Sequence, residues 1–375
     1  MKRIIHVVSC LERGGTEAFI MNHYRAMERT EYQFDFLVFR EKDYPYLGEI
    51  ERLGGRVFFC VSPSRKKIVS SIAGMVRIMK KNGPYCAVHS NINIENAWVM
   101  VAAAIAGIPV RVSHSHGTKG KEGNCIVRLY RNIQNILIKV FATQYVGCGV
   151  EAGRYLYGEA FFDKKGKVIH NGIDVNRFIS VPEEQIDTLR KSFSLDGPHG
   201  LVFGNITRFD DNKNQQFVLE VFQCIAEKYP DATLLLGGTD GGNLQMIKKK
   251  TKTLKLEKQV IFVGERNDIP ACLKLIDIYL FPSLHEGLPI ALLEAQAAGC
   301  YCIVSTAVSA ESDIGLGRVL FCDLKDSSEH WFQMIEENAI GNPRPEAEKI
   351  LKMFRKSGYD IHQSVKHLIQ IYEKE

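Results

Sequence analysis

The sequence predicts an α/β protein made of two Rossmann-like domains in tandem, and three observations carry this prediction. The 375 residues exceed the roughly 250–300 at which a single hydrophobic core stops growing. Short apolar runs alternate with stretches of helical period in both halves, as parallel sheets covered by helices require. The turn signal Asn171–Gly172 lies between the two series. We therefore expect one domain over 1–170 and a second over 171–358.

In the first half, the apolar runs predict strands that alternate with helices. The strands are expected at Ile4–Val8, Phe34–Phe39, Val57–Val61, Cys86–His89 and Val110–Ser115, and the helices at Thr16–Glu28, Tyr46–Leu53, Ile68–Lys81 and Ala97–Gly107. The second half repeats this order. Its strands are expected at Gly200–Ile206, Ala232–Gly237, Val260–Val263, Ile278–Phe281 and Tyr301–Val304, and its helices at Gln215–Lys228, Asn243–Leu254, Ile269–Leu275 and Pro289–Ala298. A last helix, Ile361–Ile371, carries its apolar residues on one stripe.

The composition disfavours several classes of protein. The first apolar run ends before Glu12 and Arg13 with no cleavage region, which favours a buried strand over a signal peptide. The longest apolar run, Ala97–Val110, is shorter than the roughly 20 residues that a membrane span needs. The ten cysteines include no C-x-x-C pair and suit small buried side chains in a reducing cytosol. We expect a cytoplasmic protein that binds no nucleic acid, because no aromatic-interleaved basic motif occurs.

The net charge of +5 is unevenly distributed along the chain. Residues 1–165 carry 24 Lys and Arg against 14 Asp and Glu, whereas the remainder is acidic. The first half is therefore expected to face something anionic, such as a phosphorylated acceptor or a membrane surface. The basic region comprises the expected helix Ile68–Lys81 and the following Lys119, Lys121, Arg128, Arg131 and Lys139. Ordinary solvated helix faces would explain it equally well.

Polar residues follow the expected strand Ile278–Phe281, at the position where open α/β sheets bind their ligands. Gly287 lets backbone approach a ligand, and Pro289 suits the first turn of the next helix, whose free amides can bind a diphosphate. Glu286 on the loop and Glu294 on the second helical turn can face one cleft and accept hydroxyl hydrogen bonds. Taken singly, each glutamate is better explained by a solvated or helix-terminal position. Their coincidence in one segment favours a nucleotide-sugar site.

Two cations follow the expected strand Gly200–Ile206. Arg208 offers a planar fork and Lys213 a point charge to a diphosphate, whose negative charge grows as a nucleotide departs. A solvated basic loop is the alternative reading. No Asp-x-Asp pair, which could hold a diphosphate through a divalent metal, occurs in the chain. Arg208, Lys213 and helix amides are therefore expected to replace a metal, and no cofactor is expected besides the nucleotide sugar.

Two features of the first half could lie beside the same ligand. Gly14–Gly15 opens the expected helix Thr16–Glu28, which is a weak phosphate signal that an ordinary turn explains equally well. His114 and His116 alternate in an extended segment, so both rings lie on one side of the chain. A zinc site would need further ligands, and none is evident in the sequence. A polar role beside a reacting sugar and a purely structural role both remain open for these histidines.

Together these residues resemble the retaining glycosyltransferases of family 4, which have the GT-B fold. The resemblance covers nearly the whole chain and is strongest over Val260–Ser305. The residues that follow in family order there are Asp277, Pro282–Ser283, Glu286, Glu294 and Gly299. His170–Asp174 resembles the family's segment at the domain junction, and Arg208 with Lys213–Asn214 matches its Arg…Lys pair. Members that build capsular or exopolysaccharide repeat units are the most similar.

The resemblance implies a role for each residue of the second domain. Glu294 would bind the ribose hydroxyls and Glu286 the donor hexose. Arg208 and Lys213 would bind the diphosphate. The backbone of Gly287 and Leu288, next to Pro289, would line the donor sugar.

From the first, acceptor-binding domain, the resemblance implies that Gly15 approaches the phosphates and that His116 lies by the anomeric carbon in an inter-domain cleft. A helix within 359–375 would cross back onto this domain. The expected catalytic residues are His116, Arg208, Lys213 and Glu286.

The expected reaction moves a hexose from a nucleotide-diphosphate sugar, most readily a UDP-sugar, to a hydroxyl of a glycan or lipid-diphosphate-linked acceptor. It would retain the anomeric configuration, use no metal, and serve surface polysaccharide biosynthesis, with the enzyme peripheral on the inner face of the cell membrane. A nucleotide-sugar epimerase of the same architecture and a non-catalytic nucleotide-sugar-binding protein are the alternatives.

Overall fold

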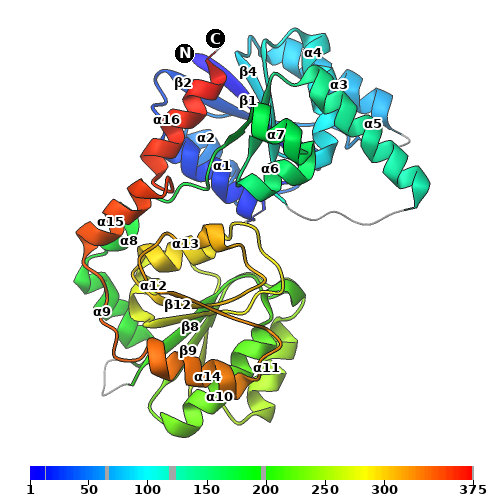
Figure 1. Cartoon of the computed structure of the whole chain (residues 1–375). Helices are drawn as coiled ribbons and strands as arrows, with labels where there is room; N and C mark the ends of the chain where they lie inside the picture. Colours follow the sequence, from blue (N-terminus) through cyan, green and yellow to red (C-terminus); the bar gives the residue numbers. More distant parts are fainter. Residues whose placement is uncertain (13, 64–66, 118–123, 196–199, 374–375) are drawn as a thin grey trace. The chain divides into compact units, whose positions relative to one another are not determined.

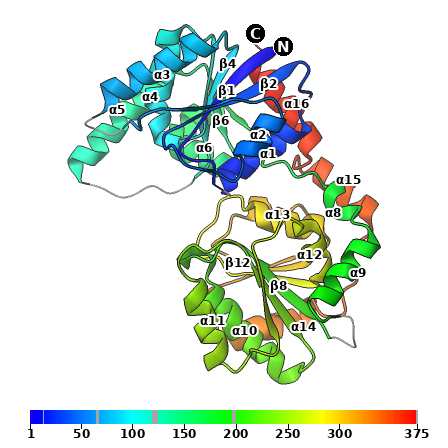
Figure 2. The same cartoon turned by 180° about the vertical axis from the view of Figure 1, so that it is seen from behind.

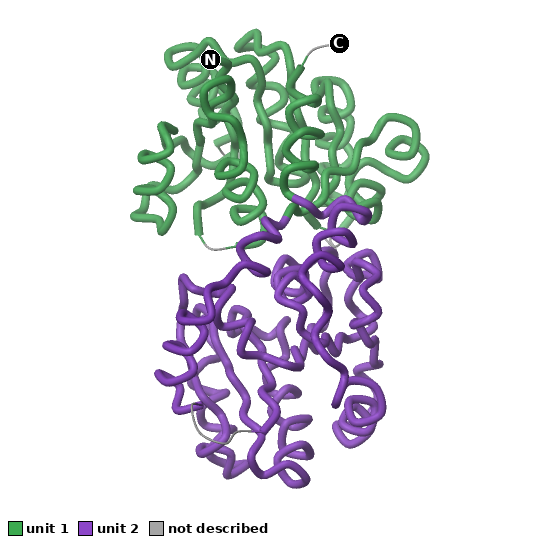
Figure 3. Tube along the Cα trace, turned by 90° about the vertical axis from the view of Figure 1, so that its left-hand side faces the viewer, with its two compact units in different colours: residues 1–172, 361–375 green, residues 173–360 purple. Residues whose placement is uncertain are grey.

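The chain forms two compact units. The computed structural model describes residues 1–12, 14–63, 67–117, 124–195 and 200–373. One unit comprises Met1–Gly172 with Ile361–Glu375, and the other comprises Ile173–Asp360, as the two colours of Figure 3 show. The boundaries expected from the sequence lie two residues before these.

The first unit contains a parallel sheet of seven strands in the order β3-β2-β1-β4-β5-β6-β7. The strands are β1 Lys2–Val8, β2 Tyr32–Val38, β3 Val57–Phe59, β4 Ala87–Ser90, β5 Val110–Ser115, β6 Gln144–Gly147 and β7 Gly166–Val168. The strand order reverses direction between β1 and β4. In open α/β sheets the carboxyl ends at such a point form the ligand crevice.

Helices cover both faces of this sheet (Figures 1 and 2). They are α1 Gly15–Ala26, α2 Leu47–Arg52, α3 Ile68–Asn82, the 3₁₀ turn η1 Asn93–Glu95, α4 Asn96–Ala106, α5 Cys125–Phe141, α6 Val150–Tyr157, α7 Glu159–Lys165 and α16 Ile361–Tyr372. One apolar core lies beneath α1, α2 and α16, and the other beneath α3 to α7. The expectation that the last helix returns to the first domain is confirmed, because Ile361, Leu368 and Ile371 are buried in the first of these cores.

The second unit repeats the architecture with a parallel sheet of six strands in the order β10-β9-β8-β11-β12-β13. The strands are β8 Val202–Ile206, β9 Thr233–Gly237, β10 Val260–Gly264, β11 Ile278–Phe281, β12 Tyr301–Ser305 and β13 Val319–Cys322. The helical elements are α8 Asn176–Ile179, α9 Glu183–Ser192, η2 Asp211–Lys213, α10 Gln215–Lys228, α11 Leu244–Thr253, α12 Ile269–Leu275, α13 Ile290–Ala297, η3 Ala310–Ser312, α14 Ser328–Asn338 and α15 Ala347–Lys356. Two tandem Rossmann-like folds are therefore confirmed.

The sequence missed the elements between β5 and β8 and those between β12 and α16. Beyond Ser115 the structure adds α5, two short strands, and the helices α6 to α9 before the second sheet begins. The strands β6 and β7 have four and three residues, too few to show a period. The sequence assigned no element to the polar stretch before Pro198, and α8 and α9 occupy much of it. Lys119 and Lys121 of the expected basic region lie outside the described residues.

The junction between the units depends on a glycine. A Cβ on Gly172 would lie 2.7 Å from Cδ1 and 2.9 Å from Cα of Ile361, so a side chain here would displace the start of α16. The next residue, Ile173, donates its N–H to Tyr359 O at 2.8 Å and forms a parallel bridge with Asp360. The two passages of the chain between the units therefore lie side by side.

Candidate functional site

The loop between β11 and α13 carries most of the residues that the sequence singled out. It is held from two sides. Leu284 N donates to Asn212 O at 2.8 Å, and the carbonyl of Glu286 accepts from Ser309 N at 3.1 Å. A parallel bridge between Glu286 and Val308 fixes the same segment. The loop is thus tied both to η2 after β8 and to the segment after β12.

Lys213 and Glu286, predicted separately, form an ion pair. Nζ of Lys213 donates to Oε1 of Glu286, and both side chains are only 18% exposed. Asn212 Nδ2 donates to the same oxygen at 2.8 Å and to His285 O at 2.9 Å. The ammonium also lies 5.2 Å from the centre of the Phe281 ring. Without a ligand, the two groups expected to hold a diphosphate and a sugar therefore neutralise each other.

Arg208 lies on the same side of the sheet but outside this pair. Its side chain is 60% exposed, and Nε lies 3.9 Å from Oδ2 of Asp210. Its backbone is fixed by Gln215, which is buried and donates from Nε2 to Thr207 Oγ1 at 3.0 Å and to Arg208 O at 2.8 Å. Gly238, with φ of +131°, lies against Thr207 at the end of β8. A side chain would not fit here, because a Cβ added at this position would lie 2.0 Å from Thr207 O. The guanidinium therefore extends into solvent from a rigid loop.

The start of α13 differs from the prediction at one residue. Pro289 was expected within the first helical turn, but it precedes the helix in an extended conformation with ψ of 118°. Its carbonyl accepts from Leu292 N at 3.2 Å and from Leu293 N at 3.3 Å. The amides of Ile290 and Ala291 are then the donors at the helix start, where anions are favoured. Leu288 is partly buried and packs its side chain against the core of the second unit.

Glu294 lies on the second turn of α13 and is half-buried. Its charge acts on Tyr279 of β11, whose pKa is raised mainly by burial and further by this carboxylate. The Tyr279 hydroxyl donates to Ile206 O at 2.9 Å, which links β11 to the end of β8. Glu294 therefore lies over the two central strands of the second sheet, at their carboxyl ends.

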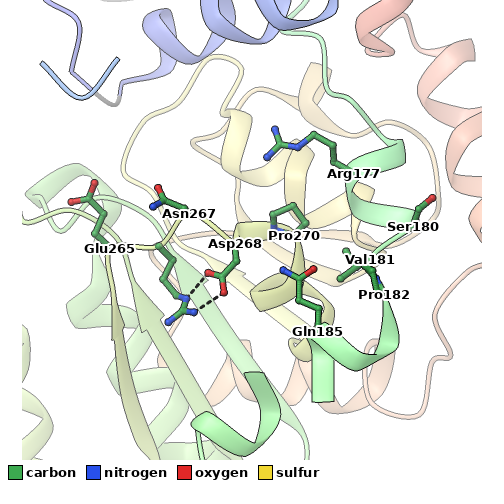
Figure 4. A pocket seen from close by; sticks show the side chains of 10 residues that line it. Arg177, Ser180, Val181, Pro182, Gln185, Glu265, Asn267, Asp268 and Pro270 are labelled. Carbon is green, nitrogen blue, oxygen red and sulfur yellow. Dashed lines mark hydrogen bonds and ion pairs between the residues drawn. The ribbon is translucent and has the colours of Figure 1, made fainter. Parts of the chain in front are cut away.

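A cavity of the second unit lies apart from these residues. It measures about 650 Å³ and is lined by α8, α9 and the segment Glu265–Pro270 after β10 (Figure 4). Arg266 and Asp268 pair across two hydrogen bonds of 2.6 Å at its wall. The cavity offers backbone and side-chain groups at Glu265, Arg266 and Asn267. None of Arg208, Lys213, Glu286 or Glu294 lines it.

In the first unit, Gly15 begins α1 as the sequence predicted. The helix start already faces a carboxylate, because a Cβ on Gly14 would lie 2.5 Å from Oε2 of Glu17. Glu17 is buried, and burial raises its pKa. Cys10 Sγ approaches its Oε1 at 3.6 Å. A phosphate at this helix start would therefore have to move the Glu17 side chain or meet it protonated.

His116 follows β5 and stacks on His114 with ring centres 4.0 Å apart, so the expected one-sided arrangement of the two rings is confirmed. Its Nε2 lies 3.0 Å from Oδ1 of Asn91, and Oδ1 of Asn93 accepts its backbone N–H at 2.9 Å. Burial lowers the pKa of His116 to about 3, with a smaller effect of His23. The ring is therefore neutral at physiological pH and can position or polarise a ligand, but cannot arrive as a charged acid.

Behind His116 lies a chain of buried polar groups that sequence reasoning missed. Nε2 of His89 lies 2.9 Å from Nδ1 of His114, and Nδ1 of His89 lies 2.7 Å from the hydroxyl of Tyr372. That hydroxyl also lies 3.3 Å from Nε2 of His6. Asn91 Nδ2 donates to His89 O at 3.1 Å and so joins His116 to the same network. The only signal in the sequence is one histidine in each of three strands, His6 in β1, His89 in β4 and His114 in β5.

Two family models match the chain. The model described as Glycosyltransferase Family 4 covers residues 13–177, and the model of glycosyl transferases group 1 covers residues 187–315. Among the described residues, no helix is both long and apolar enough to cross a lipid bilayer.

Three relatives share most of the chain. EpsF of Bacillus subtilis (strain 168), whose own glycosyltransferase assignment is provisional, is 35% identical over 99% of this chain and 96% of its own. The UDP-Gal:alpha-D-GlcNAc-diphosphoundecaprenol alpha-1,3-galactosyltransferase of Escherichia coli is 31% identical over 67% of this chain and 66% of its own. The capsular polysaccharide biosynthesis glycosyltransferase CapH of Staphylococcus aureus is 26% identical over 84% of each chain.

A solved structure shares the fold over the whole length. Alr3699/HepE of Anabaena, in complex with UDP, superposes with a TM-score of 0.78 and covers 99% of both chains at 19% identity. Both Rossmann-like units and their order along the chain are therefore those of that structure.

Proposed function

This chain belongs to glycosyltransferase family 4, and from that premise we propose that it moves a hexose from a UDP-sugar to a hydroxyl of a lipid-diphosphate-linked glycan. The acceptor class follows the printed activity of the Escherichia coli relative, and the donor follows the UDP bound by HepE. The capsular role of CapH supports a place in surface polysaccharide biosynthesis. Such an acceptor would bring the enzyme to the cytoplasmic face of an anionic membrane.

The observation that carries the proposal is the pairing of Lys213 with Glu286 before the start of α13. An incoming diphosphate is a stronger partner for the ammonium than a single carboxylate, and a sugar hydroxyl can take up the released Glu286 oxygen. Arg208, exposed on its fixed loop, supplies the second cation. Donor binding thus replaces one internal ion pair by several contacts with ligand.

Each remaining residue takes one role in this proposal. Glu294 binds the ribose hydroxyls, and the backbone of Gly287 and Leu288 lines the hexose. The amides at the start of α13 bind phosphate oxygens. His116, neutral and held by Asn91, hydrogen-bonds near the anomeric carbon.

The reaction retains configuration by a displacement on one face of the sugar. The bond between the anomeric carbon and the phosphate oxygen breaks while the acceptor oxygen forms its bond from the same side. The departing phosphate takes the acceptor proton, since His116 is not a resident acid and Glu286 is committed to binding. Arg208 and Lys213 stabilise the charge that grows on the leaving diphosphate, so the step needs no divalent metal.

Replacement of Lys213 or Glu294 by Ala tests the proposal through UDP release with a polyprenyl-diphosphate-linked acceptor. Loss of one charge-assisted contact is expected to lower kcat/KM by roughly 10²–10³-fold. Lys250→Ala is the matched control, because Lys250 also pairs with a glutamate, Glu220, on a helix remote from the loop. Near wild-type transfer in both site variants refutes the site. Conversion of the donor without acceptor would instead identify an epimerase.

A further inference from the structure

The helix α5 carries an apolar face that the protein leaves uncovered. Its large apolar residues at successive spacings of three and four are 45% to 67% exposed. They are Ile126, Leu129, Ile133, Ile136 and Val140. This spacing places all five on one side of the helix. A continuous exposed stripe of this kind is typical of an interaction surface, unlike single exposed apolar residues.

The opposite side of α5 accounts for its attachment to the unit. Ile138 and Gln134 are buried there, and Tyr130 and Leu137 pack on the core beneath α3 and α4. Figures 1 and 2 show α5 beside α4 at the edge of the first unit. The basic region expected from the sequence included Arg128, Arg131 and Lys139 of α5, but the apolar stripe beside it was assigned to α3. There Met75 and Met79 are buried and Ile72 and Val76 pack on the core, so the apolar stripe of α3 is already covered.

The positive charge of α5 indicates which kind of partner could cover its apolar face. Arg128, Arg131 and Lys139 lie on the helix, and Cys125–Phe141 contains no Asp or Glu. Pairing with α5 of a second copy would bring like charges together along the whole contact. An anionic lipid surface complements both the apolar stripe and its basic flank.

A pocket of about 390 Å³ lies along the same helix. Its wall includes Arg131, Asn132 and Asn135 of α5, Asn93 of η1, and Tyr155 and Leu156 of α6. Asn135 Nδ2 donates to Leu156 O, which ties α5 to α6 across the pocket. The described residues that line it include no carboxylate, and Arg131 can offer a planar fork to a phosphate. Ser115 and Gly117, which flank His116 in the chain, also line it.

We propose that the outer face of α5 docks on an anionic lipid bilayer and that the adjoining pocket receives the phosphorylated head group of an acceptor anchored there. The apolar stripe enters the acyl region while Arg128 and Lys139 remain among the head groups. Arg131, on the pocket wall, binds the phosphate. The inference rests on the proposed function only for the identity of the acceptor.

Vesicle flotation tests the docking. The full-length protein is mixed with phosphatidylcholine vesicles that contain or lack phosphatidylglycerol. Wild type is expected to float with the anionic vesicles, and L129Q/I133Q/I136Q to bind them at least roughly tenfold less, since three apolar side chains no longer enter the bilayer. V69Q/I105Q/M246Q removes three exposed apolar residues elsewhere and should float like wild type. Equal flotation of both triple variants overturns the proposal.

Self-association is read from the same samples by light scattering without lipid. If wild type is a dimer, the α5 variant is a monomer, and neither floats, a second copy covers α5 and the membrane proposal fails. Unchanged urea midpoints confirm that the variants fold.

The head-group pocket is tested with vesicles that carry undecaprenyl diphosphate in phosphatidylcholine. R131Q should lose the extra binding that this lipid confers, by roughly tenfold for one bidentate phosphate contact. R77Q removes the same charge from an exposed position of α3, outside both the pocket and the docking face, and should keep it. Equal losses in the two variants overturn the pocket assignment. Flotation needs no donor or turnover, so flotation without transfer refutes only the proposed function, whereas UDP release in detergent without flotation refutes only the docking.

Discussion

Nε2 of His89 lies 2.9 Å from Nδ1 of His114, so two fully buried rings on neighbouring strands share one hydrogen bond. Nδ1 of His89 lies 2.7 Å from the Tyr372 hydroxyl, so His89 is hydrogen-bonded through both of its ring nitrogens. The last helix of the chain is thereby joined to the strand that leads to His116.

Removal of that hydroxyl should loosen the first unit. Tyr372→Phe leaves two buried histidine nitrogens without their partner, and we expect a loss of about 1–3 kcal/mol in the free energy of unfolding. Trp98 lies in the first unit and Trp331 in the second, so urea unfolding followed by fluorescence in a W331F background reports the first unit. Tyr44→Phe, which removes a single bond to Arg40 O, is the control. Equal losses of unfolding free energy in the two variants would mean that the network stabilises the unit no more than a single hydrogen bond does.

Acid should destabilise the first unit more steeply than the second. Burial lowers the pKa of His6 and His116 to about 3 and that of His23 to about 4. An unfolded histidine titrates near about 6.5, so below that pH the unfolded chain binds more protons. The stabilisation is fully present above about pH 6.5 and is lost as the pH falls toward these folded pKa values, by about 1.4 kcal/mol per pH unit for each histidine.

The two tryptophans separate the units in this experiment. Urea midpoints from Trp98 should fall between about pH 7 and 5, whereas those from Trp331 in a W98F background should change less. Among the described residues of the second unit the histidines are His285 and His330, of which His330 is exposed at its surface. Parallel curves from the two reporters would contradict the prediction.

Gln215 should matter for the donor although it is buried beneath the loop. Gln215→Leu removes both hydrogen bonds, to Thr207 Oγ1 and to the Arg208 carbonyl. The backbone that carries the Arg208 guanidinium is then no longer held in place. We expect kcat/KM for the donor to fall roughly tenfold, with most of the change in KM for the UDP-sugar. Gln223→Leu on the outer side of the same helix is the control. A change in stability without a change in KM would assign Gln215 a structural role only.

Transfer should persist in a chelator. Arg208 and Lys213 are proposed to carry the charge of the departing diphosphate, so ethylenediaminetetraacetate should leave the initial rate unchanged within error. Calcium-saturated chelator serves as the control for ionic effects. A loss of rate that Mg²⁺ or Mn²⁺ restores would contradict the metal-independent step.

A methyl group at the junction should disturb the last helix. Gly172→Ala places a carbon 2.7 Å from Ile361 Cδ1 and is expected to cost about 1–3 kcal/mol in the first unit, as overpacking does. Gly48→Ala, where the added carbon meets nothing within 4 Å, should be neutral or slightly stabilising. Urea unfolding followed by the fluorescence of Trp98 distinguishes the two variants. Equal midpoints would mean that α16 shifts without loss.

The sequence predicted the central strands and the loop residues for a physical reason. Buried parallel strands are continuous apolar runs, so β8 and β11 stand out, and ligand residues follow strand ends. β8 and β11 are paired neighbours, and this pairing brings Lys213 and Glu286 together. The ion pair between Lys213 and Glu286 could not be predicted, because the local sequence pattern does not reveal the order of strands in the sheet.

What the sequence could not give depends on contacts between distant segments. No local pattern in the sequence marks Gln215, Asn91 or Tyr372. Their importance comes from the fold, which places them beside Arg208, His116 and His89 respectively. Pro289 was placed one residue too far into its helix, since proline suits both positions equally well. The outer face of α5 was missed because an apolar stripe has the same period whether it faces a core or solvent.

The first unit is completed by residues that are synthesised after the whole of the second unit. Ile361, Leu368 and Tyr372 fill its core and its histidine network, yet the whole of Ile173–Asp360 lies between them and the other residues of that core. During synthesis, one apolar face of β1 and β2 therefore stays exposed to solvent until α16 has been made. The second unit is continuous in sequence and can fold before that. The nascent chain should need protection from aggregation throughout this interval, and a ribosome stalled before Ile361 should hold a folded second unit beside an unfinished first one.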